Sequence, residues 1–303
     1  MLCSKCKKTH DGLTKTCEPC KQYLREYREK NKEKIREQKR QYYEENKEII
    51  SEYQRKYHEE NKETISEYQR KYKEENREEL REYHRQYRAS IHGKYIDIQG
   101  SSRKRNIVFE LTEDFVGEKT DEPCFYCGQE TTFETRNSLD RLDNSIGYIK
   151  MNVVSCCGTC NYMKQCLDPT TFIERCAQIS LHNGHDGDVT KYWNTIKGLM
   201  YSNYKTQTKR DFELTKEQYD NFRKNDCTYC GRKAIHGHNN GIDRMNNDIG
   251  YTVENCASCC SDCNIAKRTS TAEDFIAKCV SIASKEHSIP KGIERQVKMI
   301  LQR

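Results

Sequence analysis

The chain has 303 residues, of which 33% are charged and only 34% hydrophobic, and its formal net charge is +6. So polar a composition argues against one large hydrophobic core and favours small units held together by bound metal. No apolar run approaches the ~18 residues that a membrane span requires, so we expect no membrane partner.

Cysteine is the most informative residue type, with 18 in the chain. The opening residues MLCSKCKK lack the apolar core of a signal peptide, and paired cysteines without such a signal indicate zinc in a reducing compartment rather than disulfides. We therefore expect a location in the cytoplasm or nucleus of a host cell, or in a virion, and no secretion. Three zinc ions, each bound by four thiolates, would offset about six positive charges, so nucleic-acid affinity must come from local basic clusters.

Residues 1–20 hold two CxxC pairs separated by ten residues. This spacing predicts a small zinc ribbon with four cysteine ligands, Cys3, Cys6, Cys17 and Cys20. A redox dithiol would need only one such pair and a βαβ context that is absent.

Residues 21–90 are predicted to form a long charged helix. Four copies of a 15-residue unit fill residues 27–86, and the Tyr, Asn, Ile or Leu, and Tyr of each unit share one helical face. A continuous helix would be about 90 Å long at ~1.5 Å per residue. Residues 21–88 contain 20 Lys or Arg against 17 Glu, which excludes a basic DNA-binding arm. A solvated spacer and self-association through the Tyr/Ile stripe are the two interpretations.

A second repeat follows residues 91–106, which are interpreted as a basic Gly/Ser linker. Each residue from 109 to 179 aligns without a gap with the residue 103 positions later, and 26 of the 71 positions are identical. The chain therefore contains two modules of one kind, 107–183 and 209–303. Between them, residues 184–208 are a connecting segment, and a helix is expected over 191–205. Its apolar face would pack between the modules and consists of Trp193, Ile196, Leu199 and Met200.

Each module carries two further cysteine pairs, which predict one zinc site per module and a separate small core around it. The predicted ligands are Cys124, Cys127, Cys157 and Cys160 in the first module and Cys227, Cys230, Cys260 and Cys263 in the second. Cys156 and Cys259 directly precede a pair and remain alternatives to Cys157 and Cys260. Cys176 and Cys279 are expected to be core residues.

This order of features resembles the HNH endonuclease family: a Cys pair, an acidic residue, a central Asn, and a CxxCN sequence entering a helix. The ribbon followed by a repeat of the NKEKI type also resembles HNH proteins of phages and large DNA viruses. The resemblance covers about 150 residues in two copies. It implies an α+β chain with tandem zinc-stapled ββα-metal modules of the treble-clef type, together with the ribbon and the long helix.

The resemblance also implies roles for residues that match the family motif. Asp140 and Asn161 would bind a catalytic Mg²⁺ or Mn²⁺ in the first module, and Asn152 would brace the loop. Asp243, Asn264 and Asn255 match them in the second module. The family's general-base His is replaced by Arg141 and Arg244, and an arginine cannot take a proton from water.

Two roles for these arginines stay open, a bidentate grip on phosphate and a salt bridge to the adjacent Asp in a retired site. Replacing either arginine by His is expected to raise metal-dependent nicking. A general base supplied by His236 or His238 would exist only in the second module, because the first module has Phe133 and Thr135 at the matching positions.

The sequence therefore predicts a zinc protein that binds nucleic acid, most readily double-stranded DNA, with weak or conditional cleavage as an open outcome. The alternative is an assembly protein that uses inactive HNH-like modules and a helical spacer. The candidate contacts to nucleic acid are basic residues near the modules, Arg103, Lys104, Arg105, Lys164, Lys209, Arg210 and Lys267.

Overall fold

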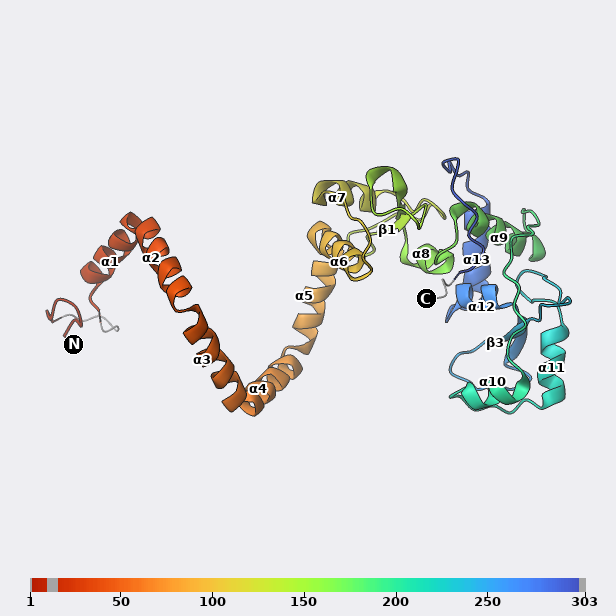
Figure 1. Cartoon of the computed structure of the whole chain (residues 1–303), viewed down its shortest axis with the longest axis horizontal. Helices are drawn as coiled ribbons and strands as arrows, with labels where there is room; N and C mark the ends of the chain where they lie inside the picture. The colour runs from red at the N-terminus through yellow and green to blue at the C-terminus, as the bar shows by residue number, and fades with distance from the viewer. Residues whose placement is uncertain (1, 10–15, 300–303) are drawn as a thin grey trace. The chain divides into compact units, whose positions relative to one another are not determined.

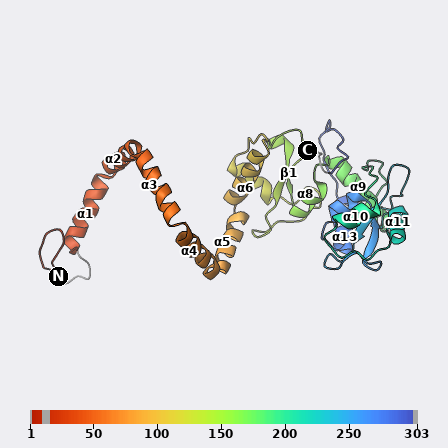
Figure 2. The same cartoon turned by 60° about the horizontal axis from the view of Figure 1, so that its bottom comes forward.

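The computed structural model describes residues 2–9 and 16–299. The chain divides into two compact units, Met1–Leu80 and Arg81–Arg303, which are described separately. It is mostly helical, with two small two-stranded sheets in the second unit (Figures 1 and 2). No helix within the described ranges combines the length and the apolar character that a membrane crossing demands.

The repeat segment is a series of helices and not one continuous helix. Its helices are α1 (Glu18–Lys30), α2 (Lys32–Glu45), α3 (Lys47–Glu60), α4 (Lys62–Glu75) and α5 (Arg77–Ala89), the last of which extends beyond the unit boundary at Leu80. Adjacent helices are separated by a single residue, and this residue is the Asn of each repeat: Asn31, Asn46, Asn61 and Asn76.

The asparagine side chain explains the interruption. Asn46 donates from its backbone N–H at 3.0 Å and from Nδ2 at 2.8 Å to one acceptor, the Tyr42 carbonyl oxygen. Its φ of −111° and ψ of 11° leave the helical region. A short amide side chain that competes for the backbone in this way ends a regular helix. The prediction of one unbroken helix was therefore wrong, because the Asn is a boundary and not a member of the stripe.

Helices α1 to α4 contain no buried residue. Local ion pairs support them instead, such as Glu52–Lys56 at 3.2 Å and Glu67–Lys71 at 3.0 Å. Exposed pairs at this spacing contribute only about 0.3–0.5 kcal/mol each. This segment is therefore held by backbone bonds and local charge and not by a core.

The region interpreted as a linker is helix α6 (Ile91–Lys104). Ser90 caps it by accepting from the Gly93 N–H at 3.0 Å. Ile98 is buried against Leu111 and Val116 of the first module. The linker prediction was wrong because this segment is a helix that buries Gly93, Ile98 and Ser102, although Ser101 is exposed.

Each module contains a β-hairpin followed by helices. In the first module the elements are α7 (Glu113–Asp121), β1 (Ser138–Arg141), the 3-10 turn η1 (Lys150–Asn152), β2 (Val153–Cys156), α8 (Gly158–Lys164) and α9 (Pro169–His182). In the second they are α11 (Lys216–Lys224), β3 (Gly241–Arg244), β4 (Cys256–Cys259), α12 (Ser261–Lys267) and α13 (Ala272–Ala283), and α10 (Tyr201–Gln207) lies before them in the connecting segment. Both hairpins are antiparallel with the same register, Arg141 opposite Val153 and Arg244 opposite Cys256.

The connecting segment forms a helix only over α10, so the prediction of a helix across 191–205 was wrong for residues 191–200. Gly198 adopts a φ of +68°, which a regular helix cannot include. Trp193 nevertheless packs against the hydrophobic core, and its ring lies 4.9 Å from the Arg175 guanidinium. The expected packing between the modules is confirmed for this residue, although the backbone is not helical.

The two modules share one core. Equivalent helices pack on each other, α8 on α12 and α9 on α13, as equivalent elements do across a two-fold interface. One cluster of buried side chains draws on both modules, including Phe172 and Cys176 from the first and Phe275 and Cys279 from the second. Each module also has a smaller buried cluster of its own, around Val116 in the first and Tyr219 in the second. The prediction of a separate core for each module therefore holds for these clusters and is wrong for the core around the cysteine groups.

Candidate functional site

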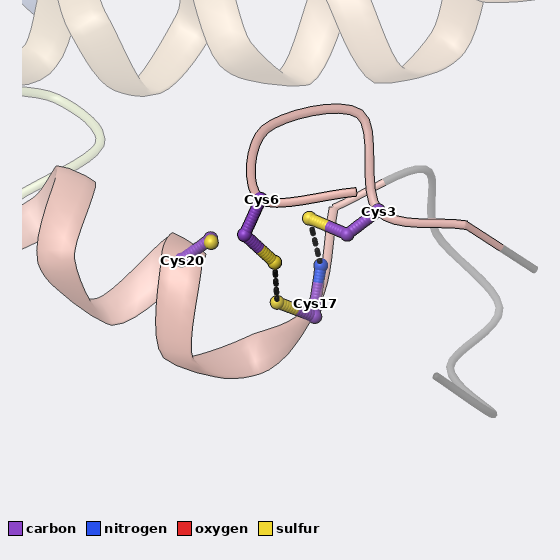
Figure 3. A group of neighbouring side chains, drawn as sticks. All are labelled: Cys3, Cys6, Cys17 and Cys20. Atoms are coloured by element: carbon purple, nitrogen blue, oxygen red, sulfur yellow. Dashed lines mark hydrogen bonds between the residues drawn. The ribbon is translucent and has the colours of Figure 1, made fainter. Parts of the chain in front are cut away.

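Three groups of four cysteines converge, and they are the three groups expected from the sequence. In the N-terminal group, Cys3 and Cys6 lie on a tight loop, while Cys17 precedes α1 and Cys20 lies in its first turn (Figure 3). The sulfurs of each group all lie within 4.8 Å of one another. All 18 cysteines are free of disulfide bonds.

The sulfur spacing fits zinc. Four sulfurs at about 2.3 Å from a central Zn²⁺ would lie about 3.8 Å apart in a tetrahedron. The Cys6–Cys17, Cys127–Cys157 and Cys230–Cys260 sulfur pairs are 3.7, 3.8 and 3.8 Å apart. Each group is therefore suited to a closed structural zinc site without an open position for substrate.

The geometry also decides between adjacent cysteines. Cys157 and Cys260 are the members of the two module groups, and each caps the helix that follows it. The Cys156 thiol instead donates to the Cys157 carbonyl oxygen at 3.5 Å, and the Cys259 thiol bonds the Cys260 carbonyl in the same way. Cys156 and Cys259 are thus excluded from the four-sulfur groups.

Backbone amides favour the thiolate form that zinc requires. The Cys3 sulfur accepts from the N–H groups of Cys17 and Lys5, each at 3.4 Å. The backbone amides of Cys17, then Cys6 and Lys5, lower the pKa of the Cys3 thiol to about 5. In the modules the Cys160 N–H bonds the Cys157 sulfur, and Cys263 bonds Cys260 in the same way.

Asp140, the expected metal ligand of the first module, lies in a buried network. Its Oδ1 is 3.0 Å from the Lys164 ammonium, and its Oδ2 accepts from the Tyr126 hydroxyl at 2.7 Å. Lys164 has no exposed surface, and Asp140 is 4% exposed. Burial raises the pKa of Asp140, and the Lys164 charge opposes that rise. The second module brings the same residue types together, but there the Lys267 ammonium at 3.0 Å and the Tyr229 hydroxyl at 2.6 Å both contact the Asp243 Oδ2.

This network leaves little opportunity for a divalent cation at the carboxylate. Both oxygens of Asp140 already have a partner, and a buried ammonium 3.0 Å away would repel a second cation. Asn161, the other expected ligand, directs its Nδ2 toward the Leu139 carbonyl at 3.4 Å, and Asn264 bonds Ile242 at 3.3 Å. In each module the internal lysine supplies the positive charge that the resemblance assigns to a metal ion.

Asn152 and Asn255 organise the loop of their hairpins. The Asn152 Oδ1 accepts from the Asp143 N–H at 2.9 Å, while its Nδ2 donates to the Asp143 and Gly147 carbonyls at 2.9 and 3.0 Å. Asn255 makes the equivalent bonds to Asn246 and Gly250. These contacts have the geometry of a loop brace, which is the role that the resemblance implies.

The two arginines also hold the loop. Arg141 donates from Nη1 to the Asn144 and Ile146 carbonyls at 2.9 and 2.8 Å, and its guanidinium lies over the Tyr148 ring at 5.3 Å. Arg244 repeats these contacts. Among the described residues the hydrogen bonds of Arg141 all come from Nη1, so the rest of the guanidinium is available to a ligand.

A surface hollow of about 400 Å³ lies at this arginine in the first module. Arg105, at the end of α6, joins Arg141 in lining it and donates to the Tyr148 hydroxyl at 2.9 Å. Asp140, which is paired with Lys164, also lines it, together with four uncharged polar side chains, Asn144, Asn161, Tyr162 and Gln165. Leu139, Tyr148, Gly158 and Cys166 complete the lining. Two guanidiniums that come from segments far apart in the sequence thus converge on one opening.

The candidate nucleic-acid contacts fall into two groups. Five are exposed, Arg103, Lys104, Arg105, Lys209 and Arg210. Lys164 and Lys267 are completely buried in the ion pairs with Asp140 and Asp243, so their prediction as phosphate contacts was wrong. Their regular spacing after the last cysteine did not reveal that they point inward.

The sequence did not reveal the two tyrosines that donate to the buried aspartates. Tyr126 and Tyr229 were not singled out, although both copies share the sequence CxYC.

His238, considered as a general base, has a structural position instead. It is buried, its Nδ1 accepts from the Ile196 N–H at 3.3 Å, and its Nε2 is paired with the Asn240 Oδ1 at 3.3 Å. That histidine therefore anchors the connecting segment, and His236 is exposed.

Comparison with known proteins identifies one relative. The chain is 33% identical over 195 residues to the uncharacterized protein R423 of Acanthamoeba polyphaga mimivirus. The match covers 63% of this chain but only 37% of that protein, so the chain spans well under half of the relative's length. No family model matches the chain, and no solved structure matches it. The chain is thus related to an uncharacterized giant-virus protein and carries three four-cysteine groups.

Proposed function

We propose that this is a zinc protein that binds the phosphate backbone of nucleic acid, double-stranded DNA in the first instance, through its HNH-like modules. Zinc occupies the three cysteine groups and holds the modules together. The Arg105–Arg141 hollow of the first module receives a phosphate.

The observation that carries this proposal is the convergence of two guanidiniums on one polar hollow. Guanidinium groups present planar sets of donors that match phosphate oxygens, and an Arg pair is a common phosphate-binding arrangement. Arg103 and Lys104 are exposed at the end of the same helix and extend the positive surface next to the hollow. The asparagine and glutamine side chains add neutral polar partners.

The proposed protein binds DNA without cutting it efficiently. An HNH reaction needs a general base and a divalent metal, whereas here an arginine stands at the position of the base and a buried lysine lies against the carboxylate expected to bind the metal. Lys164 and Lys267 neutralise the aspartates from within the protein. We therefore expect Mg²⁺ or Mn²⁺ to leave binding intact and to produce little nicking.

A salt series tests the proposal. Binding of a labelled duplex is measured by fluorescence anisotropy for the parent chain, for R105A and for R103A/K104A. R105A removes a guanidinium from the hollow and leaves the Arg141 loop contacts in place. The slope of log affinity against log salt should fall by about 0.9 for each lost phosphate contact. K233A/K291A is the control, because both lysines are exposed and lie outside the hollow.

Unchanged slopes in R105A and R103A/K104A would contradict the proposed surface. Absence of duplex binding at low salt would contradict DNA as the partner, and a competing RNA duplex identifies the preferred nucleic acid. Brisk Mg²⁺-dependent nicking by the parent would contradict the expectation of binding without cleavage.

The exposed aromatic stripe of the repeat segment favours a second candidate function, assembly through self-association. Tyr53 and Tyr68 are 69% and 70% exposed. Sedimentation of the full chain over a concentration range distinguishes this candidate, which requires a reversible dimer that Y53S/Y68S weakens. A monomer at every concentration excludes it.

A further inference from the structure

The C-terminal helix of each module covers the first cysteine knuckle of the other. In one direction, α9 reaches the Cys227–Cys230 knuckle: the Gln178 side chain donates to the Cys230 carbonyl and Asn183 to the Tyr229 carbonyl, each at 2.9 Å. These bonds fix the backbone on which two of the four sulfurs are mounted.

In the other direction, α13 and the residues after it reach the Cys124–Cys127 knuckle. Lys285 donates to the Phe125 carbonyl, and His287 lies against the Tyr126 carbonyl, each at 3.0 Å. Lys278 goes further, because its ammonium contacts a ligand sulfur. The Lys278 Nζ lies 3.5 Å from the Cys127 sulfur and 3.0 Å from the Gln129 Oε1.

The position of this contact matters because Cys127 is the weakly protected sulfur of the first module. The other three sulfurs of its group belong to buried residues, whereas Cys127 is half-buried. In the second module all four cysteines are buried. Lys278 therefore covers the side of the first group that its own module leaves open.

The chemistry of a four-thiolate site makes a cation at this point favourable. Zinc with four thiolates carries a net charge of about −2, and a donor to a thiolate orients the ligand and stabilises its charge. Lys278 aligns with Arg175 of the first module, which lies 103 positions earlier and is also a cation. The Arg175 guanidinium pairs at 3.5 Å with Asp262, a residue inside the Cys260–Cys263 knuckle. Both modules therefore place a helix cation at the zinc knuckle of the other.

We propose that Lys278 is an outer partner of the first module's zinc site supplied by the second module, so that the site is complete only when the modules are docked. This inference rests on the zinc occupancy proposed above. Lys278 acts as a positioning residue: it holds the Cys127 thiolate in place and shields it from water and from competing thiol reagents.

The test uses the full chain and three variants: K278M, which removes the cation; K278R, which retains it; and K285M, the matched control. Lys285 makes the same kind of cross-module contact but bonds a carbonyl oxygen instead of a sulfur. Zinc is withdrawn with a chelator while cysteines are alkylated, and peptide mapping follows Cys124 and Cys127 separately from Cys227 and Cys230. In K278M, Cys124 and Cys127 should be alkylated about tenfold faster than in the parent. This factor is in line with the usual 10–100-fold loss of metal affinity when an outer partner of a metal ligand is removed. K278R should restore most of the protection.

Replacing zinc by cobalt supplies a spectroscopic readout that weaker docking of the two modules would not by itself change. Loss of a donor to the Cys127 sulfur should shift the sulfur-to-cobalt charge-transfer band to lower energy in K278M, whereas K285M should retain the parent band. Equal alkylation rates and identical bands in K278M and K285M would overturn the inference. Parent protein that contains no zinc when purified in reducing buffer would overturn the zinc proposal itself, and zinc counting separates this outcome from the first.

Discussion

The Lys164 ammonium lies 3.0 Å from the Asp140 carboxylate, and both side chains are buried. The second module repeats this arrangement with Lys267 and Asp243 at 3.0 Å. A carboxylate at the motif position of a metal ligand thus has an internal cation as its partner in both copies. The pair serves the stability of each hairpin and also argues against metal chemistry at the carboxylate.

The first prediction concerns the stability of this pair. K164M should lower the free energy of unfolding by about 3–5 kcal/mol, because it leaves a buried carboxylate without its cation. The double variant D140N/K164M should lose clearly less free energy of unfolding than K164M, because neither of its two replacement side chains carries a charge. Urea unfolding monitored by circular dichroism measures both, and K150M, an exposed lysine of the same module, is the control with an expected change within about 0.5 kcal/mol. A K164M loss no larger than that of K150M would contradict the role of the pair.

A second prediction concerns the arginine beside the aspartate. The sequence alone suggested that R141H would raise nicking. With Lys164 at the carboxylate, R141H should bring no gain in Mg²⁺- or Mn²⁺-dependent nicking of supercoiled plasmid, because a new base cannot act without a bound metal. R244H should behave alike in the second module. A clear gain in either variant that disappears on adding D140N or D243N respectively would show that a metal binds despite the lysine.

A third prediction follows from the shared core. C124S and C227S should each destabilise both modules, and not only the module that loses its ligand. The lone tryptophan, Trp193, lies at the junction between the Arg175 and Arg232 guanidiniums and reports undocking by fluorescence. In both variants the fluorescence transition should coincide with loss of helix, at a lower temperature than in the parent. Hydrogen exchange that rises only in the mutated module would contradict the coupling.

The fourth prediction is a pH dependence that originates at His238. Burial, and then the nearby Arg232 charge, lower the pKa of this histidine below its ordinary value of 6.5. The folded state therefore holds the neutral form, and the unfolded chain binds the extra proton. The stability from this group is fully present above pH 6.5 and is lost as the pH falls below it.

Thermal unfolding at pH 7.5 and 5.5 checks the sign. The parent should lose more stability on acidification than H238Q, whose side chain does not titrate. H236Q is the matched control, because His236 is exposed two residues away and should leave the parent's pH dependence unchanged. Equal slopes for the parent and H238Q would place the titrating group elsewhere.

The cysteine groups were predictable because their signal is local. A CxxC pair fixes two sulfurs on one short turn, and two pairs at suitable spacing leave few alternatives. The spacing also favoured Cys157 over Cys156, and the structure confirms that choice. The sequence left Cys156 open as an alternative because it directly precedes the pair, and its place at the end of β2 excludes it from the group.

The buried ion pair was not predictable for a different reason. Asp140 and Lys164 are 24 residues apart and meet only when helix α8 packs against the hairpin. A lysine in a CxxCNxxK sequence would ordinarily be exposed, and phosphate contact was the natural expectation. The helix expected over residues 191–205 did not form over 191–200, where Gly198 has a positive φ and where Leu199 and Met200 of the expected apolar face are exposed.

The asparagine boundaries of the repeat segment have a consequence for how such a chain can change. Each unit carries its own stop and start, as in the Asn46 bonds to Tyr42, and depends on its neighbours only through local bonds. Duplication or loss of one whole unit would therefore leave every remaining boundary intact. The segment between the N-terminal cysteine group and the modules can therefore lengthen or shorten in steps of fifteen residues without a new folding problem at each step.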